Sequence, residues 1–180
     1  MRWIVFFSLL YLAAAFQSAH LAQWSEQGYF HIEYLPLLGI FYAFYAEEDS
    51  ALLACFWCGL LYDLTSQALL GLEAILLALM ALGIVKIRPH IFRNNPISQG
   101  VITFLAVLFF LAGRMVLTRL ALWNAGQPAP KINIPAFLVV AASSSLYTAV
   151  LAPWLFRLLL RLGSLLGFDS AQRRDLAAGR

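Results

Sequence analysis

Apolar runs fill most of this chain and are separated only by brief polar breaks. A helix that crosses a bilayer needs about 20 mostly apolar residues, and inside the membrane the backbone must satisfy its own hydrogen bonds. We therefore predict an all-α polytopic membrane protein with six transmembrane helices. The predicted spans cover residues 3–19, 32–46, 51–64, 68–85, 97–123 and 136–160.

The composition leaves no room for a sizeable soluble domain. Hydrophobic residues make up 62% of the 180 residues and charged residues 12%, whereas soluble domains average roughly 45–50% and 25%. We expect a single transmembrane domain over residues 1–165 and a short cytoplasmic tail over residues 166–180. The apolar segments also lack the alternation that is typical of membrane barrels. No basic stripe with interleaved aromatic residues lies outside them, so nucleic-acid binding is disfavoured.

The first apolar run has two interpretations. A cleaved signal peptide is one, since Gln17-Ser18-Ala19 ends in small residues, although an A-x-A sequence before the break is missing. We prefer an uncleaved first span with its N-terminus inside. The second and third runs are short, and we expect a helical hairpin with its acidic turn at residues 47–49. Asp49 or Ser50 could cap the third helix, because either side chain can accept a bond from a free backbone N–H.

The basic residues predict which side of the membrane each loop occupies. With six spans, nine of the twelve Lys and Arg residues fall on the side that holds both chain ends. Because cytoplasmic loops are rich in Lys and Arg, we expect both termini to be cytoplasmic. These nine residues are Arg2, Lys86, Arg88, Arg93, Arg157, Arg161, Arg173, Arg174 and Arg180.

Four charged residues lie inside or near the predicted spans, namely Asp63, Glu73, Arg114 and Arg119. Charges at membrane depth usually face the protein interior or a water-filled cavity. At a rise of about 1.5 Å per residue, Asp63 and Glu73 lie roughly 20 Å from the cytoplasmic helix ends and Arg114 about 25 Å. We expect Arg114 to pair with Asp63, Glu73 or both, and Arg119 to lie near the external interface. Such a network either holds helices together or forms a polar site for a ligand or a partner protein.

Small residues indicate which helices pack closely. Ala51, Cys55, Gly59 and Asp63 follow one another at intervals of four and so share one face of the third span. Small residues on a helix face let two backbones approach. Alanines recur along the fourth span, beginning with Ala74, and we expect the third and fourth spans to pack tightly.

Motifs for catalysis and metal binding are not found in the sequence. It contains no nucleotide-binding loop, no H-E-x-x-H and no G-x-S-x-G. Cys55 and Cys58 form a C-x-x-C, but they lie inside an apolar run, and we interpret them as small packing residues. His31 and Glu33 favour a solvated loop pair over a metal site. We therefore expect no enzyme activity, no cofactor and no metal ion.

A short motif resembles a known family. The segment Gly59-Leu60-Leu61-Tyr62-Asp63-Leu64, followed by Leu70-Gly71-Leu72, is similar to the G-L-x-x-D-L and L-G-L stretches of the rod shape-determining protein MreD. The matching residues are Gly59, Asp63 and Gly71, and the layout of the whole chain is also similar. The sequence departs from many relatives at Ala68-Leu69 and Glu73, where Pro or Phe and then His are common.

The resemblance implies a role in bacterial cell shape at the inner membrane. It implies a non-catalytic scaffold or regulator of the cell-elongation and peptidoglycan-synthesis machinery, acting with the bitopic shape protein MreC. The MreB filament and a peptidoglycan polymerase and transpeptidase belong to the same machinery, and membrane lipids surround the protein.

The family fold is similar to the substrate-binding components of energy-coupling-factor transporters, which gives an alternative function. The chain would then be a vitamin-binding membrane subunit. Such a subunit needs a polar cavity that is open to the outside, whereas a scaffold would close its polar side chains against one another or against a partner helix.

Overall fold

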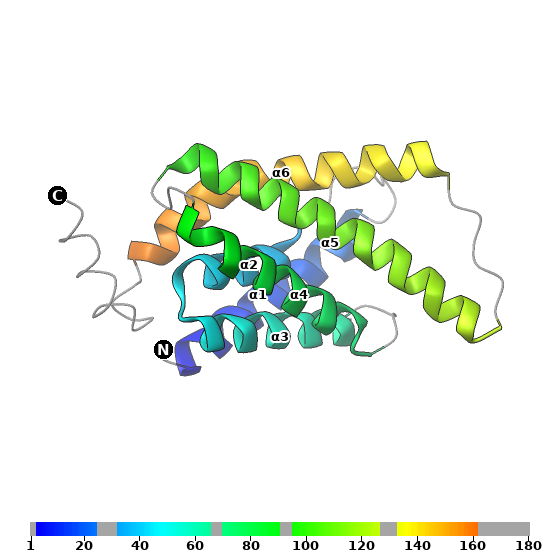
Figure 1. The fold of residues 1–180 in the computed structure, drawn as a ribbon, viewed down its shortest axis with the longest axis horizontal. Coiled ribbons are helices and arrows are strands. Elements are labelled where there is room, and N and C mark those ends of the chain that lie inside the picture. Colours follow the sequence, from blue (N-terminus) through cyan, green and yellow to red (C-terminus); the bar gives the residue numbers. More distant parts are fainter. Residues whose placement is uncertain (1–2, 25–31, 66–69, 91–94, 127–132, 162–180) are drawn as a thin grey trace.

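The computed structural model describes residues 3–24, 32–65, 70–90, 95–126 and 133–161, and these residues form six α-helices (Figure 1). The prediction of an all-α protein is confirmed over this part of the chain. The helices are α1 (Trp3–Trp24), α2 (Tyr34–Tyr45), α3 (Glu48–Thr65), α4 (Leu72–Ile87), α5 (Pro96–Asn124) and α6 (Ile134–Arg161), and the short 3-10 helix η1 (Arg88–His90) follows α4.

The six helices run alternately up and down an elongated bundle. The start of α1, the end of α6, the α2–α3 turn and the passage from η1 to α5 lie at one end, which we call the basal end (Figure 1). The opposite end, where α3 passes into α4 and α5 into α6, is the distal end. Both ends of the helical part of the chain therefore lie on the same side of the bundle.

Helix α2 is the central element of the fold. Every residue from Leu35 to Tyr45 is buried, and α2 contacts each of the five other helices. A helix that is apolar all round is shielded from water, either by lipid or by other protein. Here the other five helices surround α2, so the apolar character of this run reflects the protein core.

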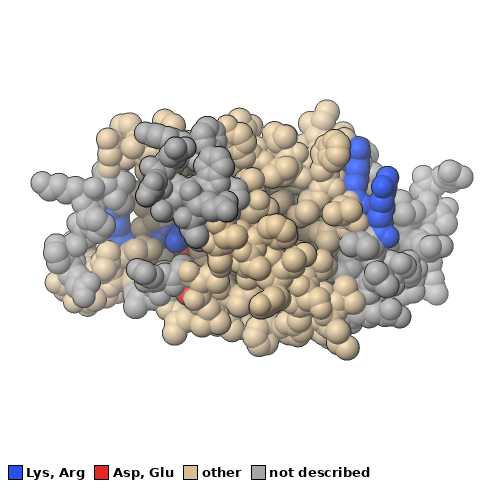
Figure 2. Space-filling view, turned by 180° about the vertical axis from the view of Figure 1, so that it is seen from behind, with Lys and Arg blue, Asp and Glu red and all other residues tan. Residues whose placement is uncertain are grey.

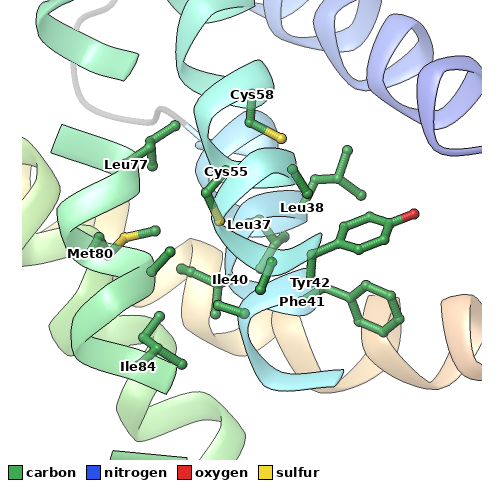
Figure 3. Close-up of a cluster of buried hydrophobic side chains, with 14 of the residues drawn as sticks. Leu37, Leu38, Ile40, Phe41, Tyr42, Cys55, Cys58, Leu77, Met80 and Ile84 are labelled. Atoms are coloured by element: carbon green, nitrogen blue, oxygen red, sulfur yellow. The ribbon is translucent and has the colours of Figure 1, made fainter. Parts of the chain in front are cut away.

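Aliphatic, sulfur-containing and aromatic side chains form the core around α2, and Figure 3 shows Phe41 and Tyr42 among them. The ring of Tyr42 meets Phe6 of α1 edge to face at 5.0 Å, and Phe41 lies 5.5 Å from Phe156 of α6. Cys55 of α3 donates a hydrogen bond to the carbonyl oxygen of Gly39 at 3.2 Å. Large rings thus hold α1 and α6 against α2, while small residues bring α3 close to it.

Among the helices that the structure describes, α5 and α6 are the two that are long and apolar enough to cross a bilayer. They contain 29 and 28 residues, so each is about 40 Å long and exceeds a hydrocarbon core of roughly 30 Å. Residues 3–19 of α1 and all of α2 form shorter apolar helices. On the face that Figure 2 shows, the middle is free of charged side chains, and Lys and Arg gather toward the two ends. This distribution fits a membrane protein.

Three predicted helix boundaries are wrong for local reasons. Helix α3 begins at Glu48, so Asp49 and Ser50 lie in its first turn and neither is its cap. Acidic residues there interact favourably with the helix N-terminus. Helix α4 begins at Leu72 rather than at residue 68, because Gly71 has a φ of +98°, which lies outside the helical region. Helix α2 begins at Tyr34, two residues after the predicted start, because Glu33 takes the N-cap position.

The basal end contains a further contact between loop and helix. Arg88 of η1 donates hydrogen bonds from Nη1 to the carbonyl oxygens of Ala43 and Ala46 at the end of α2. The last carbonyls of a helix lack partners within it and carry partial negative charge, so a guanidinium is well placed there. The tail predicted over residues 166–180 lies outside the described residues.

Candidate functional site

The candidate site is built on a close contact between α3 and α4. A Cβ atom added to Gly59 would lie 2.3 Å from Cα of Ala74 and 2.7 Å from its backbone nitrogen. Only a residue without a side chain lets these two backbones approach so closely. The predicted tight packing of the third and fourth spans is therefore confirmed, and it fixes the start of α4 beside the end of α3.

Asp63 joins the two helices at their distal ends. Its Oδ2 accepts hydrogen bonds from the backbone nitrogens of Gly71 at 2.9 Å and Ala74 at 3.2 Å, and its Oδ1 accepts one from Glu73 at 3.1 Å. The first N–H groups of a helix have no partner within it, so a carboxylate placed there satisfies them and interacts with the positive end of the helix dipole. Asp63 therefore caps α4 from a neighbouring helix.

Gly71 provides the backbone geometry that this cap requires. It precedes α4 with φ at +98°, a left-handed conformation that other residues rarely adopt. The space around it is open, so its role comes from the backbone conformation and not from packing. Gly59, Asp63 and Gly71 thus act together. Gly59 permits the contact between α3 and α4, Asp63 caps α4, and Gly71 provides the turn that leads into α4.

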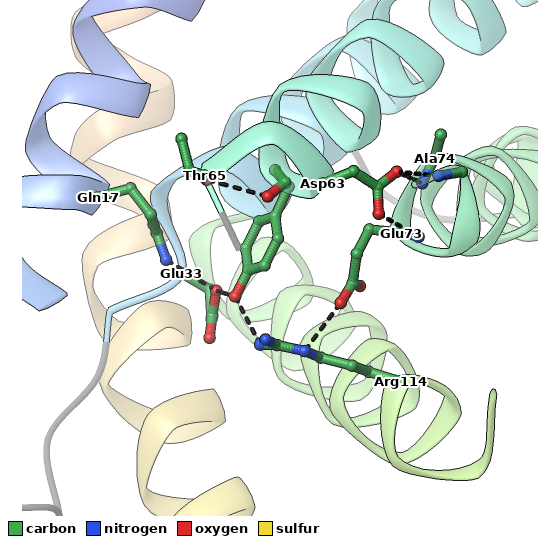
Figure 4. A network of polar contacts seen from close by, with 9 residues as sticks. Gln17, Glu33, Asp63, Thr65, Glu73, Ala74 and Arg114 are labelled. Atoms are coloured by element: carbon green, nitrogen blue, oxygen red, sulfur yellow. Dashed lines mark hydrogen bonds and ion pairs between the residues drawn. The ribbon is translucent and has the colours of Figure 1, made fainter. Parts of the chain in front are cut away.

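Arg114 of α5 forms an ion pair with Glu73 (Figure 4). The distance from Nε of Arg114 to Oε1 of Glu73 is 2.8 Å. The Glu73 side chain is 2% exposed and that of Arg114 is 34% exposed. Of the two acidic partners that the sequence left open, the structure thus pairs Arg114 with Glu73, while Asp63 binds the backbone of α4.

A second carboxylate, Glu33, lies on the other side of Arg114 (Figure 4). The hydroxyl of Tyr62 accepts a hydrogen bond from Nη1 of Arg114 at 2.8 Å and donates one to Oε2 of Glu33 at 3.1 Å. Glu33 is 4% exposed, so the interpretation of this residue as part of a solvated loop pair is wrong. Its supposed companion His31 lies outside the described residues.

Gln17 and Thr148 complete the cluster from α1 and α6. The amide of Gln17 donates from Nε2 to Oε2 of Glu33 at 3.1 Å and accepts from the backbone nitrogen of Tyr34 at 2.8 Å. Oγ1 of Thr148 accepts from the backbone nitrogen of Glu33 at 3.3 Å. Each helix, or its cap, therefore contributes to one buried polar cluster. Its members are Gln17, Glu33, Tyr62, Asp63, Glu73, Arg114 and Thr148.

The cluster contains more negative than positive charge. Three carboxylates, those of Glu33, Asp63 and Glu73, lie near one guanidinium. The N-termini of α2 and α4 each supply the equivalent of about half a positive charge. A surplus of about one negative charge remains, and Oε2 of Glu73 is buried without a hydrogen-bond partner among the described residues. The cluster can therefore accept one more proton or donor group.

The remaining predicted residues lie apart from the cluster. Arg119 forms no ion pair with the described residues, and its Nε is buried without a partner there. Ala51 and Cys55 are fully buried packing residues toward the basal end of α3. Within the described part of the chain, no group of three His, Cys, Asp or Glu residues could hold a metal ion.

Sequence reasoning did not assign Gln17, Glu33 or Tyr62 to the cluster, although two of them carried a usable signal. Gln17 is an amide inside an apolar run, and polar side chains in such runs commonly form hydrogen bonds between helices. Tyr62 directly precedes Asp63 in the motif, but its hydroxyl group was not considered as a hydrogen-bonding partner. Glu33 stands at the edge of an apolar run, where sequence alone does not separate a buried helix cap from a loop residue.

A helical bundle that has two bilayer-length apolar helices and a buried charged cluster fits a membrane protein. The family model of rod shape-determining protein MreD matches residues 1–162, and the chain belongs to this family. The family is membrane-associated and acts in determining rod shape, as the sequence motif indicated. No curated protein and no solved structure matches this chain.

Proposed function

We propose that this protein is a non-catalytic scaffold or regulator of the bacterial cell-elongation machinery. It acts in the inner membrane with the bitopic shape protein MreC, the MreB filament and the peptidoglycan polymerase and transpeptidase. The family match and the closed arrangement of the polar cluster support this function. All of the cluster's charged side chains have partners on neighbouring helices, so the cluster serves to hold a defined shape.

The proposed topology has six spans, with the basal end in the cytoplasm. The described basal helix ends carry Lys86, Arg88, Arg157 and Arg161, and cytoplasmic segments are enriched in such residues. The single transmembrane domain covers residues 1–165, and residues 166–180 extend into the cytoplasm. Because α2 is short and central, its five neighbours provide the surface that meets lipid.

Reporter fusions test this topology. A reporter that is active only outside the cytoplasm, inserted between α5 and α6, should be active, and the same reporter after residue 180 should be inactive. Lys131 in the α5–α6 loop is an external basic residue in this topology. Activity at the C-terminus would contradict an even number of spans.

The distal parts of α5 and α6 provide the surface on which we expect a partner helix to dock. Helix α5 continues for ten residues, about 15 Å, past Arg114. Leu120 and Trp123 on this part of α5, and Leu138 and Val139 on α6, are large apolar residues that are more than half exposed. Arg114 is partly exposed at the base of this region, so a partner helix could reach both apolar and charged groups.

The alternative, a vitamin-binding transporter subunit, requires a polar cavity that is open at the distal end. The acidic and basic groups of the cluster instead face one another across α3, α4 and α5 (Figure 4). This arrangement favours the scaffold.

Photocrosslinking in cells tests the scaffold function directly. A photoreactive residue at Leu120 or Leu138 should capture proteins of cell-wall synthesis. The control position is Leu79 on the apolar face of α4, which is also half exposed. Purification with a bound vitamin, or vitamin uptake that depends on an ATPase module, would overturn the proposal in favour of the transporter subunit.

A further inference from the structure

A groove with arginines along one side separates α2 from the basal half of α6. Its volume is about 660 Å³, and its lining is almost entirely apolar. Leu37 of α2 and Leu151, Leu155 and Leu158 of α6 form its walls. Tyr34 lies on the α2 side, at the distal end of the groove, because α2 begins there.

Two arginines also line the groove near its basal end. Arg157 and Arg161 are four residues apart, so they project from the same face of α6. Both are exposed, and neither forms an ion pair or hydrogen bond with the described residues. Like charges at this spacing destabilise a helix slightly, and a bound anion would offset the repulsion between the two guanidinium groups.

The length of the groove matches one leaflet of a bilayer. Ten residues separate Leu151 from Arg161 along α6, which corresponds to about 15 Å. This is half of a hydrocarbon core of roughly 30 Å. An acyl chain that enters between the leucines would therefore place its phosphate group at the level of the arginines.

We propose that this groove binds an anionic phospholipid of the cytoplasmic leaflet. The choice of leaflet rests on the proposed cytoplasmic position of the basal end. The acyl chain lies against Leu37, Leu151 and Leu155, and the guanidinium groups of Arg157 and Arg161 bind the phosphate. Arginine suits this role because its planar fork can donate two hydrogen bonds to one phosphate. A charged headgroup distinguishes this occupant from an apolar helix, which would leave both arginines without a counterion.

A second groove provides a natural comparison. It lies between α4 and α5, has a volume of about 450 Å³ and is lined by apolar residues that include Leu79, Leu105 and Phe109. No charged residue lines it. It can accept hydrocarbon, but it has no group that would select an anionic headgroup, so selectivity should belong to the α2–α6 groove alone.

Native mass spectrometry of the purified full-length protein tests the proposal. With phosphatidylglycerol and phosphatidylcholine supplied at equal concentration, the wild-type protein should retain phosphatidylglycerol preferentially. Arg157→Gln should lower its retention about fivefold, and Arg157→Gln with Arg161→Gln should lower it further. The matched control is Lys86→Gln, which removes one exposed positive charge from the basal end of α4, away from the groove, and should leave retention unchanged. Equal losses in Arg157→Gln and Lys86→Gln would overturn the proposal.

Crosslinking identifies the occupant without relying on the arginine variants. A photoreactive residue at Leu158 should form an adduct with the mass of a phospholipid in native membranes, and the adducts should be richer in anionic lipid than those formed at Leu105. A protein adduct at Leu158, from a second copy of this chain or from another helix, would overturn the proposal. These measurements do not depend on cell shape, so they can fail while the scaffold function holds.

Discussion

Arg114 donates a hydrogen bond to the hydroxyl of Tyr62 at 2.8 Å, and this contact joins the two halves of the buried polar cluster. On one side, Tyr62 donates to Glu33, which is also bound by Gln17 of α1. On the other side, Arg114 pairs with Glu73 at the start of α4. One hydroxyl group therefore connects the carboxylate of Glu33, the residue that precedes α2, with the ion pair between α4 and α5.

Replacement of Tyr62 by Phe should destabilise the protein by about 1–3 kcal/mol, because Glu33 and Arg114 each lose a buried hydrogen-bond partner. The ring itself remains, so its edge-to-face contact with Phe110 at 5.5 Å is kept. Thermal unfolding in detergent measures the effect. Tyr11→Phe is the control, since Tyr11 is 77% exposed and should tolerate the change. Equal stability of the two variants would show that the hydroxyl bridge contributes nothing.

Removal of Arg114 should cost more than removal of the whole ion pair. Arg114→Met leaves Glu73 buried without a counterion, and the expected loss is about 3–5 kcal/mol. Adding Glu73→Gln should recover part of this loss, because the unpaired negative charge of Glu73 is then gone. Denaturant unfolding of the wild type, the two single variants and the double variant gives the four free energies of a double-mutant cycle. Arg119→Met serves as the control, because Arg119 has no ion pair among the described residues.

The expected order of stability in this cycle is wild type, then the double variant, then Arg114→Met. If Arg114→Met were as stable as Arg119→Met, the ion pair would have no structural role, and the cluster would have to be explained by function alone. A double variant less stable than Arg114→Met would instead mean that Glu73 forms its main contact elsewhere.

The sequence predicted the helices well because apolar runs and the breaks between them are local properties. It also predicted the contact of α3 with α4, since Gly59 and its small neighbours share one face. It did not predict that Asp63 caps α4 while Glu73 forms the ion pair with Arg114. Both carboxylates lie at similar depth, and the choice depends on the rotation of α4 about its axis, which the sequence pattern does not specify.

The position of α2 shows a second limit of the sequence. An apolar run of this length is compatible with a helix against lipid and with a helix in a protein core, because both environments exclude water. The structure places it in the core, where Leu35 and Phe41 are fully buried. The same ambiguity hid Glu33, whose burial follows from the central position of α2 and not from its neighbours in sequence.

Loss of the cap on α4 should be measurable as local destabilisation. Asp63→Ala removes an acceptor that serves three backbone N–H groups, and we expect a loss of about 2 kcal/mol or more, at the upper end for a helix cap. Amide hydrogen exchange should increase in the first turn of α4 before it increases in the rest of the helix. Asp49→Ala, in the exposed first turn of α3, should cost less than about 1 kcal/mol. Uniform exchange along α4 would contradict the capping role.

Of the Gly→Ala substitutions in the described part of the chain, Gly59→Ala should be the most damaging. The added methyl group would meet the Cα and nitrogen of Ala74 and the carbonyl oxygen of Glu73, all of them backbone atoms that cannot rotate away. Separation of α3 from α4 would also withdraw Asp63 from its three backbone donors, so we expect a cost at or above the upper end of the range of about 1–3 kcal/mol for overpacking. Gly83→Ala is the matched control on α4, because a Cβ there meets no atom within 4 Å, and alanine stabilises a helix interior by roughly 0.5–1 kcal/mol relative to glycine. The two variants should therefore shift the unfolding temperature in opposite directions, and a shared direction would mean that the α3–α4 contact is looser than the structure has it.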